Sequence, residues 1–102
     1  MSEERESGVA VAEGRPRVKE PPRFVVLLHN DDYTTMDFVV EVLQRFFQKT
    51  EDQAVKLTME IHTKGRAVAG VYTPEIAEAK AVQVVDTARS RGFPLKATAE
   101  PA

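Results

Sequence analysis

Phe24-Val25-Val26-Leu27-Leu28-His29 is a continuous run of β-prone, mostly apolar residues that follows two prolines. Such a run is typical of a central strand that is covered on both faces, or nearly so. It ends at Asn30-Asp31-Asp32-Tyr33, whose short polar side chains favour a turn by bonding to the local backbone. We therefore expect a central strand from which the chain leaves the sheet at about residue 30.

Helical patterns follow this strand. Thr34 with Asp37 three residues later resembles a capping box. Apolar residues then recur at helical spacing, namely Met36, Val39, Val40, Leu43, Phe46 and Phe47. Thr50 and Gln53 form a second capping pair, followed by Ala54, Leu57 and Ile61 on one stripe. Two helices are expected here, the second ending at Gly65.

The rest of the chain predicts two more strands and a third helix. Residues 66–72 read as a strand whose small residues permit close packing by a group above them. Thr73-Pro74-Glu75 begins a helix with a cap, a proline and an acid, and Gly92 stops it. Residues 94–98 suggest a last strand that starts at a proline. We predict an α+β fold: a compact two-layer β-α-α-β-α-β domain with a three-stranded antiparallel sheet and three helices.

Length and composition limit the possible functions. With 102 residues the chain has room for one domain, and its formal charge of -2 gives no basic footprint for nucleic acid. Residues 1–22 are rich in charge, glycine and proline and contain no aromatic residue, so we expect a disordered N-terminal extension before a core domain at 23–102. The absence of cysteine and of a signal or membrane-spanning run suits a cytoplasmic protein.

Some polar residues could carry chemistry, although each also has a structural interpretation. Asn30, Asp31 and Asp32 lie where a strand gives way to a helix, but such residues are also the commonest turn formers. His62 ends the second helix, where the default role is contact with the helix dipole or with free carbonyls. His29 could join Asp31, Asp32 and His62 at a metal, but no HxH or HExxH spacing supports this. The sequence also lacks cysteine, a Gly-x-Ser-x-Gly motif and a glycine-rich phosphate loop, so we expect neither an enzyme nor a cofactor.

One stretch carries a resemblance to a known family. Residues 28–40, Leu-His-Asn-Asp-Asp-Tyr-Thr-Thr-Met-Asp-Phe-Val-Val, resemble the signature of the ClpS family, adaptors of the bacterial Clp protease. Further family-like segments follow in the family's order and cover nearly all of residues 23–101: Glu60-Ile61-His62, Gly70-Val71-Tyr72-Thr73, Glu75 to Lys80, and Pro94-Leu95. The resemblance implies a binding module that presents N-degron proteins to the ClpA unfoldase of the ClpAP protease. These proteins begin with Leu, Phe, Tyr or Trp.

The same resemblance implies roles for individual residues. Asn30, Asp32 and His62 match positions that hold the substrate's α-amino group. A free α-amine has a pKa of about 8 and three donors when protonated, so a carboxylate, an amide carbonyl and a neutral imidazole nitrogen suit it. The hydrophobic pocket for the first side chain would be lined by Leu28, Asp31, Thr34, Met36, Val39, Thr58, Ile61 and Leu95. Met36 corresponds to the gate against β-branched residues, although its helical spacing also places it on the core stripe.

Two positions depart from the family pattern, and other positions imply partners. Thr58 stands where the family usually has Met, so the pocket wall is expected to be roomier or more polar there. His29 replaces an aliphatic residue. Glu75 and Lys80, expected to be exposed on the third helix, match positions that dock on the N-terminal domain of the unfoldase. We expect a monomer that binds neither nucleic acid nor membrane.

Two other classes of function fit parts of the sequence. The carboxyl-terminal domain of the ribosomal stalk protein has a similar small β-α-α-β-α-β shape, but it gives no reason for an Asn-Asp-Asp turn with a remote histidine. A small metal-dependent hydrolase is the other alternative.

Overall fold

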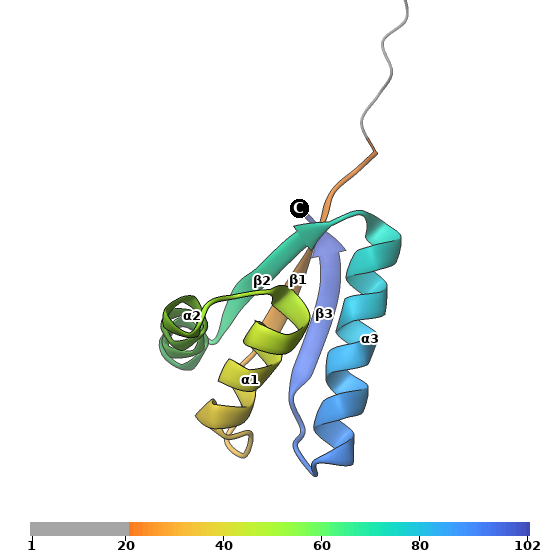
Figure 1. Ribbon diagram of the computed structural model, residues 1–102. Coiled ribbons are helices and arrows are strands. Elements are labelled where there is room, and N and C mark those ends of the chain that lie inside the picture. The colour runs from red at the N-terminus through yellow and green to blue at the C-terminus, as the bar shows by residue number, and fades with distance from the viewer. Residues whose placement is uncertain (1–20) are drawn as a thin grey trace, which may run out of the picture.

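Two helices lie across one face of a three-stranded antiparallel sheet, and a third packs beside them (Figure 1). The computed structural model describes residues 21–102. In chain order the elements are β1 (Phe24–His29), α1 (Met36–Phe47), α2 (Glu51–Lys64), β2 (Arg66–Tyr72), α3 (Pro74–Ser90) and β3 (Lys96–Pro101). The predicted α+β class and element order are confirmed. The last strand begins at Lys96, two residues later than predicted.

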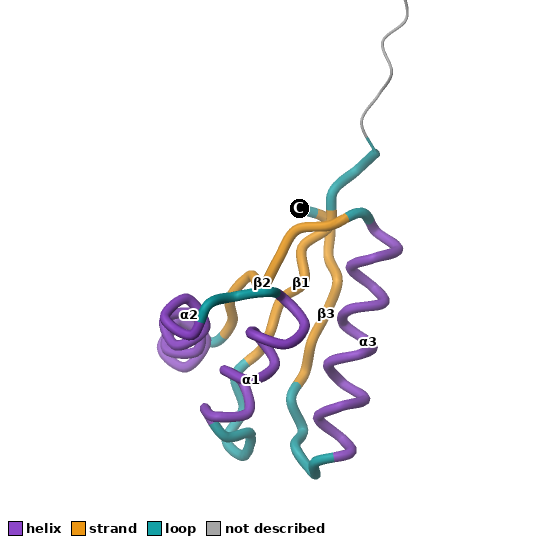
Figure 2. Tube along the Cα trace, in the orientation of Figure 1, coloured by secondary structure: helices purple, strands orange, loops and turns teal. Residues whose placement is uncertain are grey.

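β1 is the central strand, as its sequence predicted. The sheet order is β2-β1-β3, and both pairings are antiparallel. Val26 and Leu28 of this strand are fully buried. Figure 2 shows α1 and α3 on the same side of the sheet. The expectation of cover on both faces, or nearly so, holds for β1 itself, in which Val26, Leu27 and Leu28 are buried. On the face away from the helices, Val68 and Val71 of β2 are 42% and 47% exposed. Leu27 is buried on that face among neighbours in the sheet, which explains why an unbroken apolar run occurs on a sheet with helices on one face.

The helix caps explain where the helices begin and end. Thr35, not Thr34, caps α1, since its hydroxyl accepts from the Phe38 amide at 3.2 Å. The predicted capping box at the start of α2 is confirmed by reciprocal bonds between Thr50 and Gln53. Gly65 ends α2 at a φ of 92°, a left-handed conformation that favours glycine.

The core lies between the helices and the covered face of the sheet. On α1 the buried residues include Phe38 and Val42, which the predicted stripe omitted. Met36 is 43% exposed at the first turn of α1, so its expected place on the core stripe was wrong. On α3 the buried residues are Ala77, Ala81, Val84 and Ala88, and Val85 beside them is half-buried. The small residues of β2 do allow close packing, because the ring of Tyr72 lies over Gly70 and leaves no room for a Cβ.

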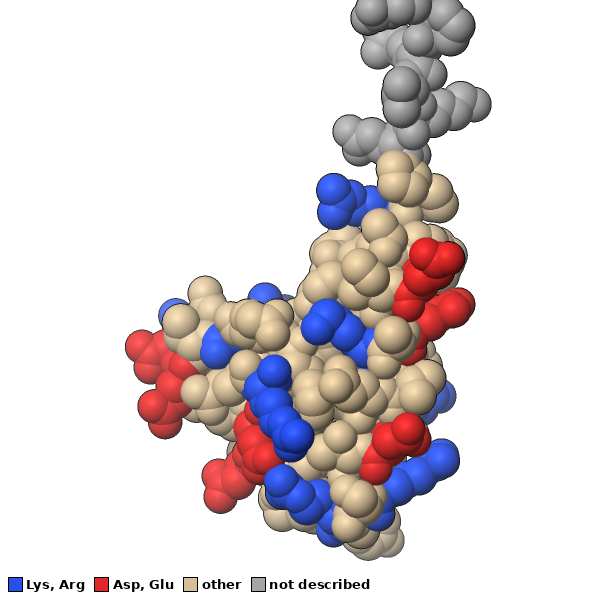
Figure 3. Space-filling view, turned by 45° about the vertical axis from the view of Figure 1, so that its right-hand side comes forward, with Lys and Arg blue, Asp and Glu red and all other residues tan. Residues whose placement is uncertain are grey.

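Within residues 21–102, no helix has the length and apolar character that a membrane span requires. The face in Figure 3 carries basic and acidic residues interspersed with uncharged surface. The N-terminal extension expected at residues 1–22 lies, except for Pro21 and Pro22, outside the described residues, so it stays a prediction.

Candidate functional site

The loop between β1 and α1 is built around the side chain of Asp31. Its Oδ1 accepts from the amides of Tyr33 and Thr34 at 2.8 and 2.7 Å, and its Oδ2 accepts from the Thr34 hydroxyl at 2.7 Å. Burial raises the pKa of the Asp31 carboxyl, but the hydrogen bonds from Thr34 and Tyr33 outweigh it and hold the pKa below its ordinary value. Asp31 therefore fixes the loop in its charged form.

This loop is tied to the end of α2. The Asn30 amide donates to the Gly65 carbonyl at 2.9 Å, and the Gly65 amide donates to the Ile61 carbonyl at 2.9 Å. These two bonds join the first residue after β1 to the last turn of α2, which carries His62. The structure therefore brings the Asn-Asp-Asp segment beside the turn of α2 that contains the histidine.

The three residues matched to amine binding share one property. Asn30, Asp32 and His62 are all exposed, whereas Asp31 between them is partly buried and bonded to its own loop. Two of the three come from one rigid turn and the third from a capped helix end. Their polar groups can therefore meet a ligand from solvent.

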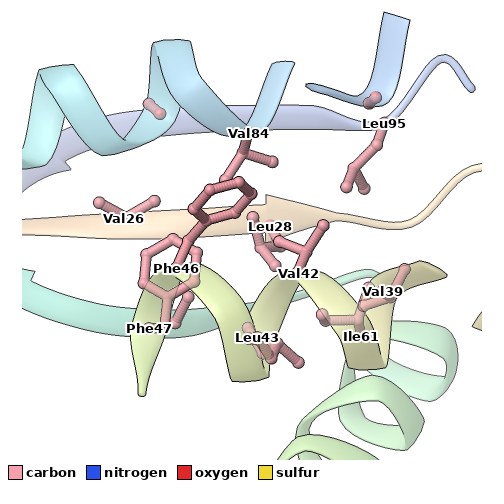
Figure 4. Close-up of a cluster of buried hydrophobic side chains, with 14 of the residues drawn as sticks. Val26, Leu28, Val39, Val42, Leu43, Phe46, Phe47, Ile61, Val84 and Leu95 are labelled. Carbon is pink, nitrogen blue, oxygen red and sulfur yellow. The ribbon is translucent and has the colours of Figure 1, made fainter. Parts of the chain in front are cut away.

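The residues assigned to the hydrophobic pocket divide into buried and surface groups. Leu28, Val39, Ile61 and Leu95 belong to one buried cluster, with exposed fractions of 0%, 6%, 3% and 3%. Figure 4 shows Leu95 pointing toward α1, where Val39 and Val42 lie, with Ile61 beyond them. Met36 is at the surface, and Thr34 is partly buried with its hydroxyl on Asp31. Apolar side chains from β1, α1, α2 and the segment before β3 are thus assembled beneath the polar loop.

Thr58 is the buried polar residue of the core within residues 21–102. It is 5% exposed, and its hydroxyl donates to the Ala54 carbonyl one turn earlier at 2.8 Å. The neighbouring Met59 is 46% exposed. Because the Thr58 hydroxyl is already bonded within the helix, the main difference from a methionine at this position is the smaller volume of threonine.

The structure separates the residues of the alternative metal site. The Thr98 hydroxyl donates to Glu100, so it accepts from Nε2 of His29 at 2.8 Å. Burial, followed by the charge of Lys96, lowers the pKa of His29. The described residues contain no cluster of three or more His, Cys, Asp or Glu suited to a metal ion. His29 thus faces β3, while the carboxylate of Asp31 faces its own loop.

The two residues assigned to unfoldase docking differ in their surroundings. Glu75 is exposed in the first turn of α3. The expectation that Lys80 is exposed was wrong, because its Nζ donates to the Phe46 carbonyl at 2.7 Å and is only partly accessible. Nζ also lies 5.7 and 5.2 Å from the ring centroids of Phe47 and Tyr72. Lys80 therefore satisfies a carbonyl at the end of α1.

Sequence reasoning missed one group of contacts near Leu95. Arg91 pairs with Glu41, and the ring of Phe93 packs on that of Phe38 with centroids 4.9 Å apart. Fifty-odd residues separate the partners in each contact, so no local spacing could have revealed them. In the sequence, residues 91–93 indicated only that a helix ends there, at Gly92.

Comparisons with known proteins agree with this architecture. A family model described as "ATP-dependent Clp protease adaptor protein ClpS" matches residues 19–98. Proteins named ATP-dependent Clp protease adapter protein ClpS in Xanthomonas oryzae and Xanthomonas campestris are each 48% identical over 101 residues, covering 99% of this chain and 95% of theirs.

A solved structure shows the same fold. Agrobacterium tumefaciens ClpS2 bound to L-phenylalaninamide superposes with a TM-score of 0.79 and is 41% identical, covering 81% of this chain and 100% of that one. These matches favour neither the ribosomal stalk domain nor a metal-dependent hydrolase. With its fold, its Asn-Asp-Asp loop and these relatives in agreement, the chain belongs to the ClpS family of adaptor proteins of the ATP-dependent Clp protease.

Proposed function

We propose that this chain binds the free α-amino group and the bulky hydrophobic first residue of N-degron substrates. The observation that carries the proposal is the hydrogen bond from the Asn30 amide to the Gly65 carbonyl, 2.9 Å long, which joins the exposed Asn-Asp-Asp loop to the helix end bearing His62. The ligand of Agrobacterium tumefaciens ClpS2 supports it. L-Phenylalaninamide has a free α-amine, an aromatic side chain and an uncharged carboxamide, as the first residue of a polypeptide has.

The exposed residues match the chemistry of an ammonium group. Three N–H donors need three acceptors, and at least one of them should be anionic. The Asp32 carboxylate, the Asn30 side-chain carbonyl and a ring nitrogen of His62 provide that set. The Asp31 carboxylate already accepts three hydrogen bonds from Tyr33 and Thr34, so its proposed part in the site is to hold the loop.

The first side chain would enter among the apolar residues beneath the loop. Val39, Ile61 and Leu95 would contact it, with Met36 at the surface of α1 as a gate. Leu, Phe, Tyr and Trp are the expected first residues. Three charge-assisted bonds and one buried side chain, offset by the cost of association, give a dissociation constant on the order of micromolar.

Delivery of the substrate to a ClpA-type unfoldase completes the proposed role. Glu75 is the better candidate for docking, because it is exposed and Lys80 is bonded to α1. The chain would act as a monomeric adaptor without catalytic activity of its own.

Replacement of one carboxylate tests the amine site. We expect Asp32→Ala to weaken binding of a labelled peptide beginning with Phe by roughly 10-fold or more, because loss of a charge-assisted bond costs about 1.5–3 kcal/mol. Asp52→Ala is the matched control, since Asp52 is an exposed aspartate in the first turn of α2, at the opposite end from His62. Equal affinity of the two variants, measured by fluorescence anisotropy, would overturn the assignment of Asp32.

A further inference from the structure

Four side chains connect α1 to the segment that follows α3. Arg91 Nη2 lies 2.7 Å from Glu41 Oε2, and its guanidinium carbon lies 5.3 Å from the centroid of the Phe38 ring. The ring of Phe93 also packs on Phe38, with centroids 4.9 Å apart and planes inclined at 37°. We call Glu41, Arg91, Phe38 and Phe93 the clamp.

The α3 side of the clamp is fixed by its own backbone. The amides of Arg91 and Phe93 both donate to the Ala88 carbonyl, at 3.0 and 2.9 Å. Gly92 between them has a φ of 81°, a left-handed conformation that allows this tight turn. Leu95 follows Phe93 by two residues and is 3% exposed. The clamp therefore holds the short segment that delivers Leu95 to the buried cluster.

The α1 side of the clamp lies in the turns that carry the proposed pocket residues. Phe38 and Glu41 are interleaved along the helix with Met36 and Val39. Phe38 is 3% exposed, so its ring is a fixed support for both Arg91 and Phe93. A displacement of the segment 91–95 relative to α1 would therefore change the space between Leu95 and Val39.

The ion pair of the clamp has the properties of a positioning contact rather than of a stabilising one. The Arg91 and Glu41 side chains are 45% and 42% exposed, and ion pairs at such exposure contribute little to folding stability. The pair nonetheless restricts the orientation of Arg91, because its guanidinium contacts both the Glu41 carboxylate and the face of the Phe38 ring. We propose that the clamp fixes the distance between Leu95 and α1 and thereby limits the size of the first side chain that the pocket accepts. This inference rests on the proposed function.

The test compares size selectivity in clamp variants. Peptides beginning with Leu, Phe or Trp are titrated into the full chain, Arg91→Ala, Phe93→Leu and Glu41→Arg/Arg91→Glu. Arg89→Ala is the matched control, since it removes an exposed arginine from the same end of α3. We expect Arg91→Ala and Phe93→Leu to change the ratio of the Leu and Trp dissociation constants by about threefold in favour of Trp, about 0.6 kcal/mol. The charge exchange should partly restore the original ratio.

The outcomes separate this inference from the proposed function. An unchanged ratio in Arg91→Ala, with a normal thermal unfolding curve, would overturn the clamp, as would an equal change in Arg89→Ala. If Phe93→Leu fails to fold, Arg91→Ala alone decides the question. Equal binding of free and amino-acetylated peptides by the unaltered chain would instead overturn the proposed function, and the clamp with it.

Discussion

At the scale of single residues, Asp31 shows how a polar cluster divides its tasks. All three members of Asn30-Asp31-Asp32 looked alike as turn formers in the sequence. In the structure, the carboxylate of Asp31 accepts three hydrogen bonds from the loop. Its neighbours Asn30 and Asp32 are exposed. The turn-forming contacts therefore belong to Asp31, and the amine-binding role proposed for Asn30 and Asp32 falls on residues whose side chains are exposed.

The lowered pKa of Asp31 predicts a pH-dependent contribution to stability. A carboxyl whose pKa is lower in the folded than in the unfolded state stabilises the fold above its unfolded pKa of about 3.9, and the contribution is lost as pH falls toward the folded value. We expect Asp31→Asn to reduce the free energy of unfolding at pH 7 by about 1 kcal/mol. The difference from the unaltered chain should shrink below about pH 4.

Urea unfolding at pH 7, 5 and 3 measures this effect. Asp86→Asn is a suitable control, because Asp86 is an exposed aspartate on α3 far along the chain from the loop. A difference between Asp31→Asn and the unaltered chain that stays constant from pH 7 to pH 3 would contradict the role given to the charged carboxylate.

Thr58 leads to a prediction about ligand preference. A methionine in its place would add volume at a buried position whose polar atom is already bonded to Ala54. We expect Thr58→Met to alter the ranking of peptides beginning with Leu, Phe, Tyr and Trp, while the preference for a free over an acetylated amine is kept. Anisotropy titrations of the four peptides measure the ranking, and an unchanged order would refute this prediction.

The resemblance assigned Leu28, Val39, Ile61 and Leu95 to one pocket. The structure places all four in the buried core, and their part in a pocket stays a prediction. The partners of Asp31 and Thr58 were not predicted, because a hydroxyl or carboxylate can bond to several nearby backbone groups. Packing decides among them.

At the scale of elements, the end of α1 depends on a side chain from α3. The last carbonyls of a helix lack partners within the helix, and Lys80 supplies a donor to that of Phe46. Gln48, the only residue other than glycine with a positive φ within residues 21–102, then turns the chain toward α2 at a φ of 52°. Lys80 thereby connects two elements through a charged hydrogen bond.

Removal of this donor should therefore affect stability. We expect Lys80→Met, which keeps the apolar stem over Phe47 and Tyr72, to reduce the free energy of unfolding by about 1–2 kcal/mol. For a domain of this size, each kcal/mol lowers the melting temperature by about 4–8 °C. Thermal unfolding of Lys80→Met beside Lys56→Met, an exposed lysine of α2, measures the loss. Equal melting temperatures would show that the bond to Phe46 is unimportant.

Local sequence signals predicted the ends of an element well where both interacting residues lie within a few positions of each other. The Thr50–Gln53 capping box and the Gly65 stop act within a few residues, and both were correct. The cap of α1 was displaced by one residue because Thr34 and Thr35 are chemically equivalent, and the bond from Thr34 to Asp31 leaves Thr35 as the cap. β3 begins at Lys96, which pairs with His29, the last residue of β1, and no local pattern contains this long-range pairing.

At the scale of the whole molecule, the layered arrangement brings together the segments that form the proposed site. Helices pack on one face of the sheet, and the loop after the central strand meets the end of α2 at the edge of the core. The apolar run of β1 predicted its central place, but not which face would stay open, because cross-strand neighbours can bury a residue such as Leu27 without a second layer. The proposed site lies where these layers and the polar loop meet.

The most direct test of amine recognition is a comparison of three labelled peptides by fluorescence anisotropy. One begins with Phe, the second is its amino-acetylated form, and the third carries an extra Met before the Phe. We predict binding in the micromolar range for the first and loss of at least about 10-fold in affinity for the other two, because acetylation removes the charge and the extra residue displaces the Phe side chain. Equal affinity for all three peptides would contradict the account.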